Sequence, residues 1–230
     1  MTNRIILAFD TSTEIFEARL SGRNLNRVLS IPSGLRHAEQ IAVAAQQLLA
    51  NLGLAHIDAV AYARGPGSFT GLRIGAAFCK GLCAGSEPRL VSVPTLQAMV
   101  DTWLLHPPSL PADGITHLLP CIDGKKQRFY VQLYTVNGTA LGPVIDATQD
   151  AAHQLLSAQG ADPSRTVLLG PHAEKCATFL QNSDFQTALT DSGCSSGLAA
   201  GARAALASFQ FDADNVGPQY YRLSQAEEGS

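Results

Sequence analysis

Residues 4–31 read RIILAFDTSTEIFEARLSGRNLNRVLSI, and their pattern indicates how the chain begins to fold. The run Arg4–Asp10 is short, apolar and continuous, as expected for a buried central strand. Two more strand-like runs follow at Ile15–Leu20 and Asn24–Ile31, with Ser21-Gly22 between them as a hairpin signal. The chain is therefore predicted to open with three consecutive strands.

Helices and strands alternate after this opening. Apolar residues recur at helical spacing over 41–52, the strand-like run Ile57–Tyr62 follows, and a second helix is predicted over 72–85. The strand Arg89–Val93 then leads into a third helix that begins at Pro94-Thr95. The order β-β-β-α-β-α-β-α predicts a mixed sheet covered by helices.

A proline-rich stretch, 106–114, predicts a boundary between an N-terminal part, 1–106, and a smaller α/β part, 107–230. Beyond it, Leu118–Asp123 and Arg128–Val136 alternate like paired strands. The other predicted elements of this part are a tight turn at Asn137-Gly138, a strand at Thr166–Leu169 and an alanine-rich helix around Gly197–Phe209.

Composition narrows the classes of function. The 230-residue chain has a net charge of −3 and only 15% charged residues, against roughly 25% in a typical soluble domain. It therefore lacks the basic field that a stand-alone nucleic-acid binder needs. The apolar run Ile5–Phe9 is too short for a signal peptide or a membrane span. Five scattered cysteines are typical of reduced thiols, so we expect a cytoplasmic protein without a structural metal.

Two polar segments are candidates for holding a phosphate. Asp10, Thr11 and Ser12 follow the first strand and would place a carboxylate and hydroxyls at the sheet edge. Asp123 opens the run Asp123–Arg128, which would face that turn across a cleft. The alternatives are an ordinary turn stabilised by its own side chains and a charged hairpin tip.

A glycine-rich stretch, Gly65–Gly75 (GPGSFTGLRIG), leads into the second helix. Such a loop can present backbone N–H groups to an anion. It is not a Walker A loop, because Leu72-Arg73 stands where Lys-Ser/Thr is required, and its spacing also fails GxGxxG. We favour the alternative, in which the glycines allow close backbone approach to a packed neighbour.

The first two helices carry unusually little charge. Residues 40–57 hold no formal charge, whereas a helix packed on one sheet normally has a charged outer face. The second helix has two apolar stripes, and only Arg73 and Lys80 in it are charged. A second apolar stripe indicates a protein interface, unless the C-terminal helix covers it or the alanine-rich composition merely dilutes the charge. Small residues on the second helix at 71, 75, 81 and 85 would permit close approach of a partner.

No catalytic constellation is visible. The six histidines never lie three or four residues apart, and HExxH and GxSxG are both absent. A peptidase therefore has no support in the sequence, and we assign no catalytic residue.

Several strings occur together in a characteristic order, and through them the chain resembles the bacterial TsaB family, also called YeaZ. They are Ile6–Thr13, Arg36-His37, Gly65–Gly75, Lys80–Leu82, Val91–Leu96, Cys121–Lys126 and Pro218–Glu227. The resemblance covers nearly the whole chain, and GPGSFTGLRIG is its most specific string.

This resemblance implies an actin/Hsp70/sugar-kinase-like (ribonuclease H-like) fold of two halves. It also implies a non-catalytic part in forming threonylcarbamoyladenosine in tRNAs that read ANN codons. The paralogue TsaD would be the catalyst, and the ATPase TsaE would join the complex. This chain would contact tRNA only indirectly, as part of that complex. No cofactor is expected, except ATP or ADP at the partner interface, and the isolated chain would form a homodimer.

In such proteins the first two helices hold TsaD in a helical bundle. The residues expected at this interface are Arg36, His37, Ile41, Ala45, Leu48, Gly71, Leu72, Arg73, Gly75, Phe78 and Lys80. The alternative function is a small-molecule kinase of the same fold, in which Asp10 and Asp123 would flank a nucleotide. Two departures from the family pattern concern the second half: Arg128 replaces an acidic residue, and Gly170-Pro-His-Ala173 lacks a glycine.

Overall fold

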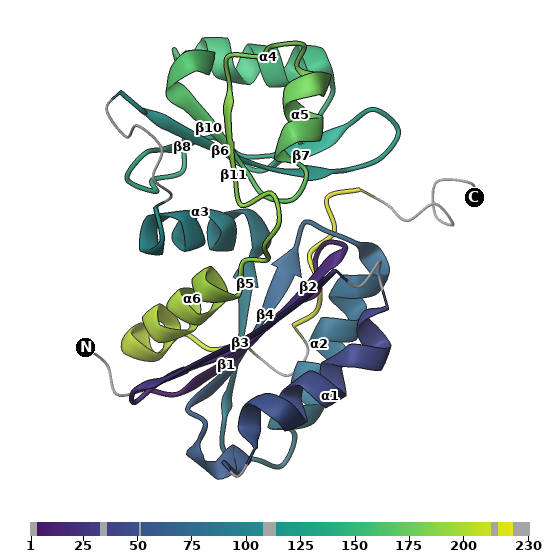
Figure 1. Cartoon of the computed structure of the whole chain (residues 1–230), viewed down its shortest axis with the longest axis vertical. Helices are drawn as coiled ribbons and strands as arrows, with labels where there is room; N and C mark the ends of the chain where they lie inside the picture. The colour runs from purple at the N-terminus through teal and green to yellow at the C-terminus, as the bar shows by residue number, and fades with distance from the viewer. Residues whose placement is uncertain (1–3, 33–35, 51, 108–113, 213–215, 223–230) are drawn as a thin grey trace.

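The computed structural model describes residues 4–32, 36–50, 52–107, 114–212 and 216–222. Two β-sheets lie one above the other, and helices cover their faces (Figure 1). Most of the predicted proline-rich boundary and the end of the C-terminal family string, residues 223–227, lie outside the described residues.

The first sheet is mixed, as the sequence predicts. Its strands have the spatial order β3-β2-β1-β4-β5, with β1 antiparallel to β2 and parallel to β4. The strand bounds are β1 Ile6–Asp10, β2 Ile15–Gly22, β3 Leu25–Pro32, β4 Ala59–Gly65 and β5 Arg89–Pro94. Both faces of β1 are covered by helices, which explains why the strand is a continuous apolar run.

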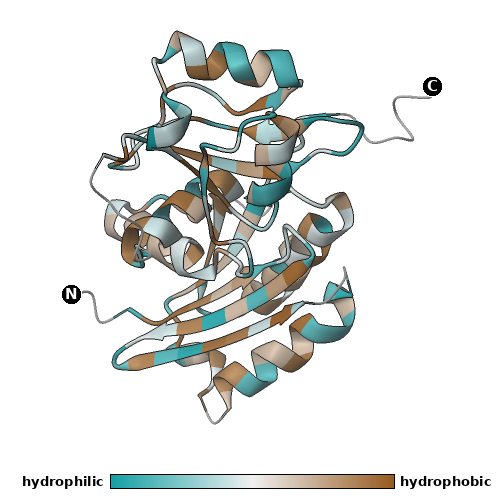
Figure 2. Ribbon diagram, turned by 45° about the horizontal axis from the view of Figure 1, so that its top comes forward, coloured by the Kyte–Doolittle hydropathy of each residue, from teal (hydrophilic) through white to brown (hydrophobic). Residues whose placement is uncertain are grey.

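The β2–β3 hairpin turns two residues later than predicted. Gly22 still pairs with Leu25, and Arg23 and Asn24 form the turn with φ values of 45° and 67°. Positive φ at both central residues gives the turn twist that suits a two-residue hairpin. Hydrophilic and hydrophobic residues alternate along this hairpin (Figure 2). One of its faces packs against the first two helices, whereas polar residues on the other face of β2 contact the C-terminal helix.

Four helices cover the first sheet, two on each face. Helices α1 (His37–Leu49) and α2 (Phe69–Cys83) pack on one face, whereas α3 (Thr95–Leu105) and α6 (Ser195–Ser208) pack on the other, between the two sheets (Figure 1). Helix α2 begins three residues earlier than predicted because Ser68 caps it, its Oγ accepting from the Gly71 N–H at 3.3 Å. Such a cap contributes about 1 kcal/mol.

The second sheet has the order β11-β10-β6-β7-β9, and β8 pairs with β6. Its strands are β6 His117–Asp123, β7 Phe129–Val131, β8 Tyr134–Thr135, β9 Ile145–Ala147, β10 Thr166–Leu169 and β11 Gln186–Ala188. Helices α4 (Gln149–Ala158) and α5 (Ala173–Phe179) cover its outer face. Two short 3₁₀ helices, η1 (Leu54–His56) and η2 (Pro163–Arg165), precede β4 and β10.

Helix α6 comes from the C-terminal part of the sequence but packs against β1 and α3. This close packing depends on Gly197, where a Cβ would collide with the Ala98 carbonyl oxygen of α3. The first half is therefore built from both ends of the chain, which differs from the predicted division at 106/107. Because α6 lies on the opposite face of the sheet, it does not cover α1 and α2.

Candidate functional site

The exposed sides of α1 and α2 form a surface of mostly small and uncharged residues. The two helices contact each other and pack side by side on the sheet (Figure 1). Water-facing helix surfaces normally carry several charges, and such a bare surface is typical of a protein interface. We define the α1–α2 face as the exposed residues Ala38, Glu39, Ala42, Val43 and Gln46 of α1 and Thr70, Arg73, Ala77 and Gly81 of α2. Glu39 and Arg73 are its two charged residues.

The residues predicted for the partner interface separate into two groups. Arg36 and Arg73 are exposed, and Phe78 and Lys80 are half-buried, so these four can meet a partner. The other seven are buried in the chain's own core: His37, Ile41, Ala45, Leu48, Gly71, Leu72 and Gly75.

The seven buried residues therefore correct the predicted interface. Helical periodicity identifies an apolar stripe but does not show whether that stripe contacts the rest of the chain or a partner. In this structure the stripe packs on the first sheet. His37, for example, is fully buried and donates from Nε2 to the Thr13 carbonyl oxygen at 2.8 Å. Burial lowers the pKa of His37, although that hydrogen bond and Asp10 oppose the shift.

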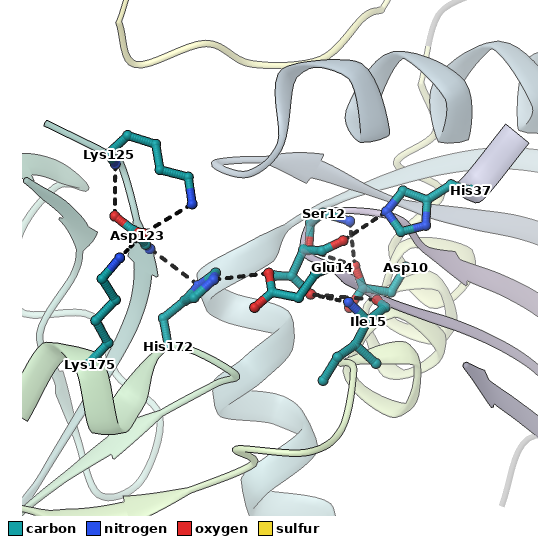
Figure 3. A network of polar contacts seen from close by, with 10 residues as sticks. Asp10, Ser12, Glu14, Ile15, His37, Asp123, Lys125, His172 and Lys175 are labelled. Atoms are coloured by element: carbon teal, nitrogen blue, oxygen red, sulfur yellow. Dashed lines mark hydrogen bonds and ion pairs between the residues drawn. The ribbon is translucent and has the colours of Figure 1, made fainter. Parts of the chain in front are cut away.

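The turn after β1 is closed rather than open to an anion. Asp10 is 1% exposed, and its Oδ1 accepts from the backbone N–H and the hydroxyl of Ser12 at 2.9 and 2.6 Å. Its Oδ2 accepts from the N–H of Cys194 at 2.9 Å, where α6 begins. The carboxylate of Asp10 is thus fully occupied by donors from its own chain. Figure 3 shows those from Ser12.

Glu17 is a second buried carboxylate beside this turn, opposite Asp10 in the β1–β2 register. It accepts from the N–H of Gly193 at 3.2 Å and from the N–H of Ser195 at 3.1 Å. Together the two carboxylates hold the backbone N–H groups at the start of α6. Acidic groups are favourable there because the N-terminal N–H groups of a helix have no partner within the helix.

The glycine-rich stretch packs tightly on the same turn. A Cβ at Gly67 would lie 2.5 Å from the Ser12 carbonyl oxygen, and Cβ atoms at Gly71 and Gly75 would collide with Thr11. Thr11 and Ser12 are accordingly buried. The favoured prediction of close backbone packing is confirmed, and the described structure leaves no open phosphate site among Asp10, Thr11 and Ser12.

Asp123, the fourth nucleotide candidate, lies in the second half at the end of β6. Its carboxylate binds Lys175 Nζ at 2.6 Å and Lys125 Nζ at 3.1 Å. Burial alone would raise the pKa of Asp123, but hydrogen bonds from Lys175 and Lys125 prevail and lower it to about 2. Asp123 is therefore neutralised by lysines of its own half, as in a charged hairpin tip.

A side-chain pair, Glu14 and His172, bridges the halves between these two sites. His172 Nδ1 accepts from the Asp123 N–H at 3.2 Å, so its Nε2 carries a proton and donates to Glu14 Oε2 at 3.0 Å (Figure 3). The hydrogen bond from His172 lowers the pKa of Glu14 from 4.5 to about 2, against the opposing effect of burial. Glu14, four residues after Asp10, is thus linked to Asp123 through His172.

The Glu14–His172 pair should make stability depend on pH. Because the folded pKa of Glu14 is below its unfolded value, its stabilisation is complete above pH 4.5 and is lost as the pH falls from about 4.5 towards about 2. Urea unfolding should show wild type more stable than Glu14→Gln at pH 6, with the difference shrinking by pH 3. Exposed Glu87→Gln is the control, and a pH-independent difference for Glu14→Gln would contradict the assignment.

Arg128, where the chain departs from the family pattern, has a structural partner. Its Nε donates to Asp146 Oδ2 at 3.0 Å. Arg222 forms a two-pronged pair with the same carboxylate, from Nε to Oδ2 at 2.9 Å and from Nη2 to Oδ1 at 2.7 Å. Two arginines therefore share Asp146, and this links the β6–β7 hairpin to the C-terminal segment. Sequence reasoning missed Asp146, as it missed Glu17 and Ser195, because nothing in the local pattern marks their distant partners.

Within the described ranges, no group of three His, Cys, Asp or Glu side chains could hold a metal ion. All five cysteines are free thiols. No helix in the described part of the chain combines the length and apolarity needed to cross a bilayer.

The two mixed sheets and the helices on their faces form an α/β fold of two halves. The chain belongs to the family described as TsaD, tRNA N6-adenosine threonylcarbamoyltransferase, whose family model matches residues 33–225.

Two curated relatives carry the name tRNA threonylcarbamoyladenosine biosynthesis protein TsaB. The Haemophilus influenzae protein is 39% identical over 101 residues, which are 43% of this chain and 43% of the relative. The Escherichia coli protein is 34% identical over 128 residues, which are 54% of this chain and 52% of the relative. The matched region spans about half the length of these relatives, and the resemblance to TsaB (YeaZ) is confirmed.

Solved structures show the same fold. YeaZ from Pseudomonas aeruginosa superimposes with a TM-score of 0.75 at 20% identity, covering 94% of this chain and 99% of that one. A second P. aeruginosa structure, described as an uncharacterized protein with similarity to peptidase YEAZ, also gives 0.75 at 20% identity, with 95% and 100% covered. The predicted fold class is confirmed.

Proposed function

We propose that this chain is a non-catalytic scaffold and activator in the formation of threonylcarbamoyladenosine in tRNAs that read ANN codons. It would bind a TsaD-type paralogue, which performs the transfer, and a TsaE-type ATPase would join the two in the cytoplasm. The family match and the names of the relatives support the process. The observation that carries the scaffold role is the α1–α2 face, where Glu39 and Arg73 are the only charges among small and uncharged residues and which the described elements of the chain leave exposed.

The closed turn after β1 supports the absence of catalysis. In a kinase of this fold, Asp10 would have to reach a nucleotide, yet its oxygens already accept four hydrogen bonds within the chain. Asp123 is likewise engaged by two lysines. Any ATP or ADP would therefore bind at the interface with the paralogue and not within this chain alone.

Reconstitution of the reaction tests the proposal. TsaD-type and TsaE-type proteins from the same organism are incubated with threonylcarbamoyl-adenylate, ATP and unmodified tRNA, with and without this chain, and modified nucleoside is measured by mass spectrometry. Product should fall to background without the chain and return with an Asp10→Asn variant that remains folded. Undiminished product in its absence would refute the scaffold role, and ATP hydrolysis by the isolated chain would favour the kinase alternative.

A further inference from the structure

The C-terminal segment 216–222, which we call the C-terminal strap, joins the two halves at the side of the molecule. In the first half, the Gln219 N–H donates to the Arg64 carbonyl oxygen at 2.8 Å. In the second half, Arg222 binds Asp146 and also donates to the Gly124 carbonyl oxygen at 3.0 Å. The strap is therefore anchored at both ends, with Tyr220 between the anchors.

Tyr220 belongs to a stack with two residues of α2. Its ring lies 4.9 Å from that of Phe69, centroid to centroid. The guanidinium of Arg73 lies 3.8 Å from the Phe69 centroid and 5.7 Å from the Tyr220 centroid. Arg73 Nε also donates to the Tyr220 hydroxyl at 2.9 Å. The Arg73 side chain is thus held in one orientation by two rings and one hydrogen bond.

The terminal nitrogens of Arg73 have no acceptor among the described residues, although its Nε is satisfied. Phe69 and Tyr220 remain 36% and 43% exposed beside it. Arg73 lies one turn before Ala77 on the exposed stripe of α2, so the stack continues the α1–α2 face. A rigid, two-pronged donor next to exposed aromatic rings matches the geometry of a carboxylate, which arginine binds through two parallel hydrogen bonds.

We infer that Phe69, Arg73 and Tyr220 form the main anchor for the TsaD-type partner, and that Arg73 receives an Asp or Glu side chain of that partner. This inference rests on the proposed function, because the partner is the protein proposed there. Aromatic and arginine side chains dominate the energetics of protein interfaces. The strap contributes by fixing Tyr220, which holds Arg73 in place, so that the Arg73 side chain loses little conformational entropy when the complex forms.

Titration calorimetry with the purified TsaD-type paralogue tests the inference. Arg73→Ala should raise the Kd at least about tenfold, as truncation of an interface anchor does. Arg73→Lys should also weaken binding, by about fivefold or more, because lysine keeps the charge but loses the planar fork. Tyr220→Ala should raise the Kd about fivefold or more by releasing Arg73.

Arg89 provides a matched control, since its guanidinium also stacks on an aromatic ring, that of Phe211, at 5.3 Å on the other side of the sheet. Arg89→Ala should bind like wild type, and thermal melts should show all variants folded. Wild-type affinity for Arg73→Ala would overturn the anchor, and full affinity for Arg73→Lys would overturn the two-pronged carboxylate. Failure of the wild-type chain itself to bind would instead refute the proposed function.

Discussion

A Val43→Glu substitution should weaken binding of the TsaD-type partner by more than a hundredfold while the chain stays folded. Val43 is 51% exposed within the α1–α2 face, so in the isolated protein water would solvate a carboxylate at this position. Glutamate also has a higher helix propensity than valine. In the complex the same carboxylate would be buried without a cation, at a cost of about 3 kcal/mol or more. Since about 1.4 kcal/mol corresponds to a tenfold change in Kd, complex formation should nearly disappear.

The matched control for this variant is Ala204→Glu, at an exposed position of α6 on the opposite face of the sheet. Calorimetry should show unchanged affinity for it. Light scattering of the isolated chain at micromolar concentration adds a second readout, because we propose that the α1–α2 face pairs with a second copy when the partner is absent. Val43→Glu should then be a monomer, and wild-type affinity together with an intact dimer would show that the interface lies elsewhere.

Gly71→Ala should destabilise the protein by about 3 kcal/mol, since overpacking against an unyielding neighbour costs 1–3 kcal/mol and occasionally more. The added Cβ would collide with the Thr11 carbonyl oxygen and lie 3.2 Å from His37 Cδ2. The Thr11 carbonyl oxygen cannot move away, because it belongs to the backbone of the buried turn that Asp10 stabilises. His37 is fully buried and hydrogen-bonded to Thr13, so its ring cannot move away either. For a chain of this size the loss should lower Tm by about 6–12 °C.

Gly81→Ala in the same helix should have the opposite sign. No atom lies within 4 Å of a Cβ at Gly81, so the change should stabilise the protein by about 1 kcal/mol through helix propensity alone. Scanning calorimetry of both variants measures the contrast. An unaltered Tm for Gly71→Ala would contradict this packing. Because Gly71 and Gly75 pack against Thr11, only Gly81 and Gly85 of the four predicted small residues have space beside them for a partner.

Local signals in the sequence predicted most of the first sheet. The buried run of β1, the helix that Pro94-Thr95 opens and, in the second sheet, the strand at Thr166–Leu169 are each marked by the residue types of a few consecutive positions, and all are confirmed. Helices α4 and α5 were not predicted, because each is short and buries only two residues, Ala152 and Leu156 in α4 and Ala173 and Cys176 in α5. Element bounds moved by a few residues where a cap, such as Ser68, decided them.

The order of residues along the chain was enough to predict the class of fold, the family and the low charge of α1 and α2. Which stripe of these helices remains exposed became clear from the packed structure, because helical periodicity is the same for a stripe that contacts the sheet and one that contacts a partner. The packed structure also shows that Asp10 is occupied by the start of α6 and that Tyr220 stacks on Arg73. These contacts join residues more than a hundred positions apart, and no local pattern encodes such a pairing.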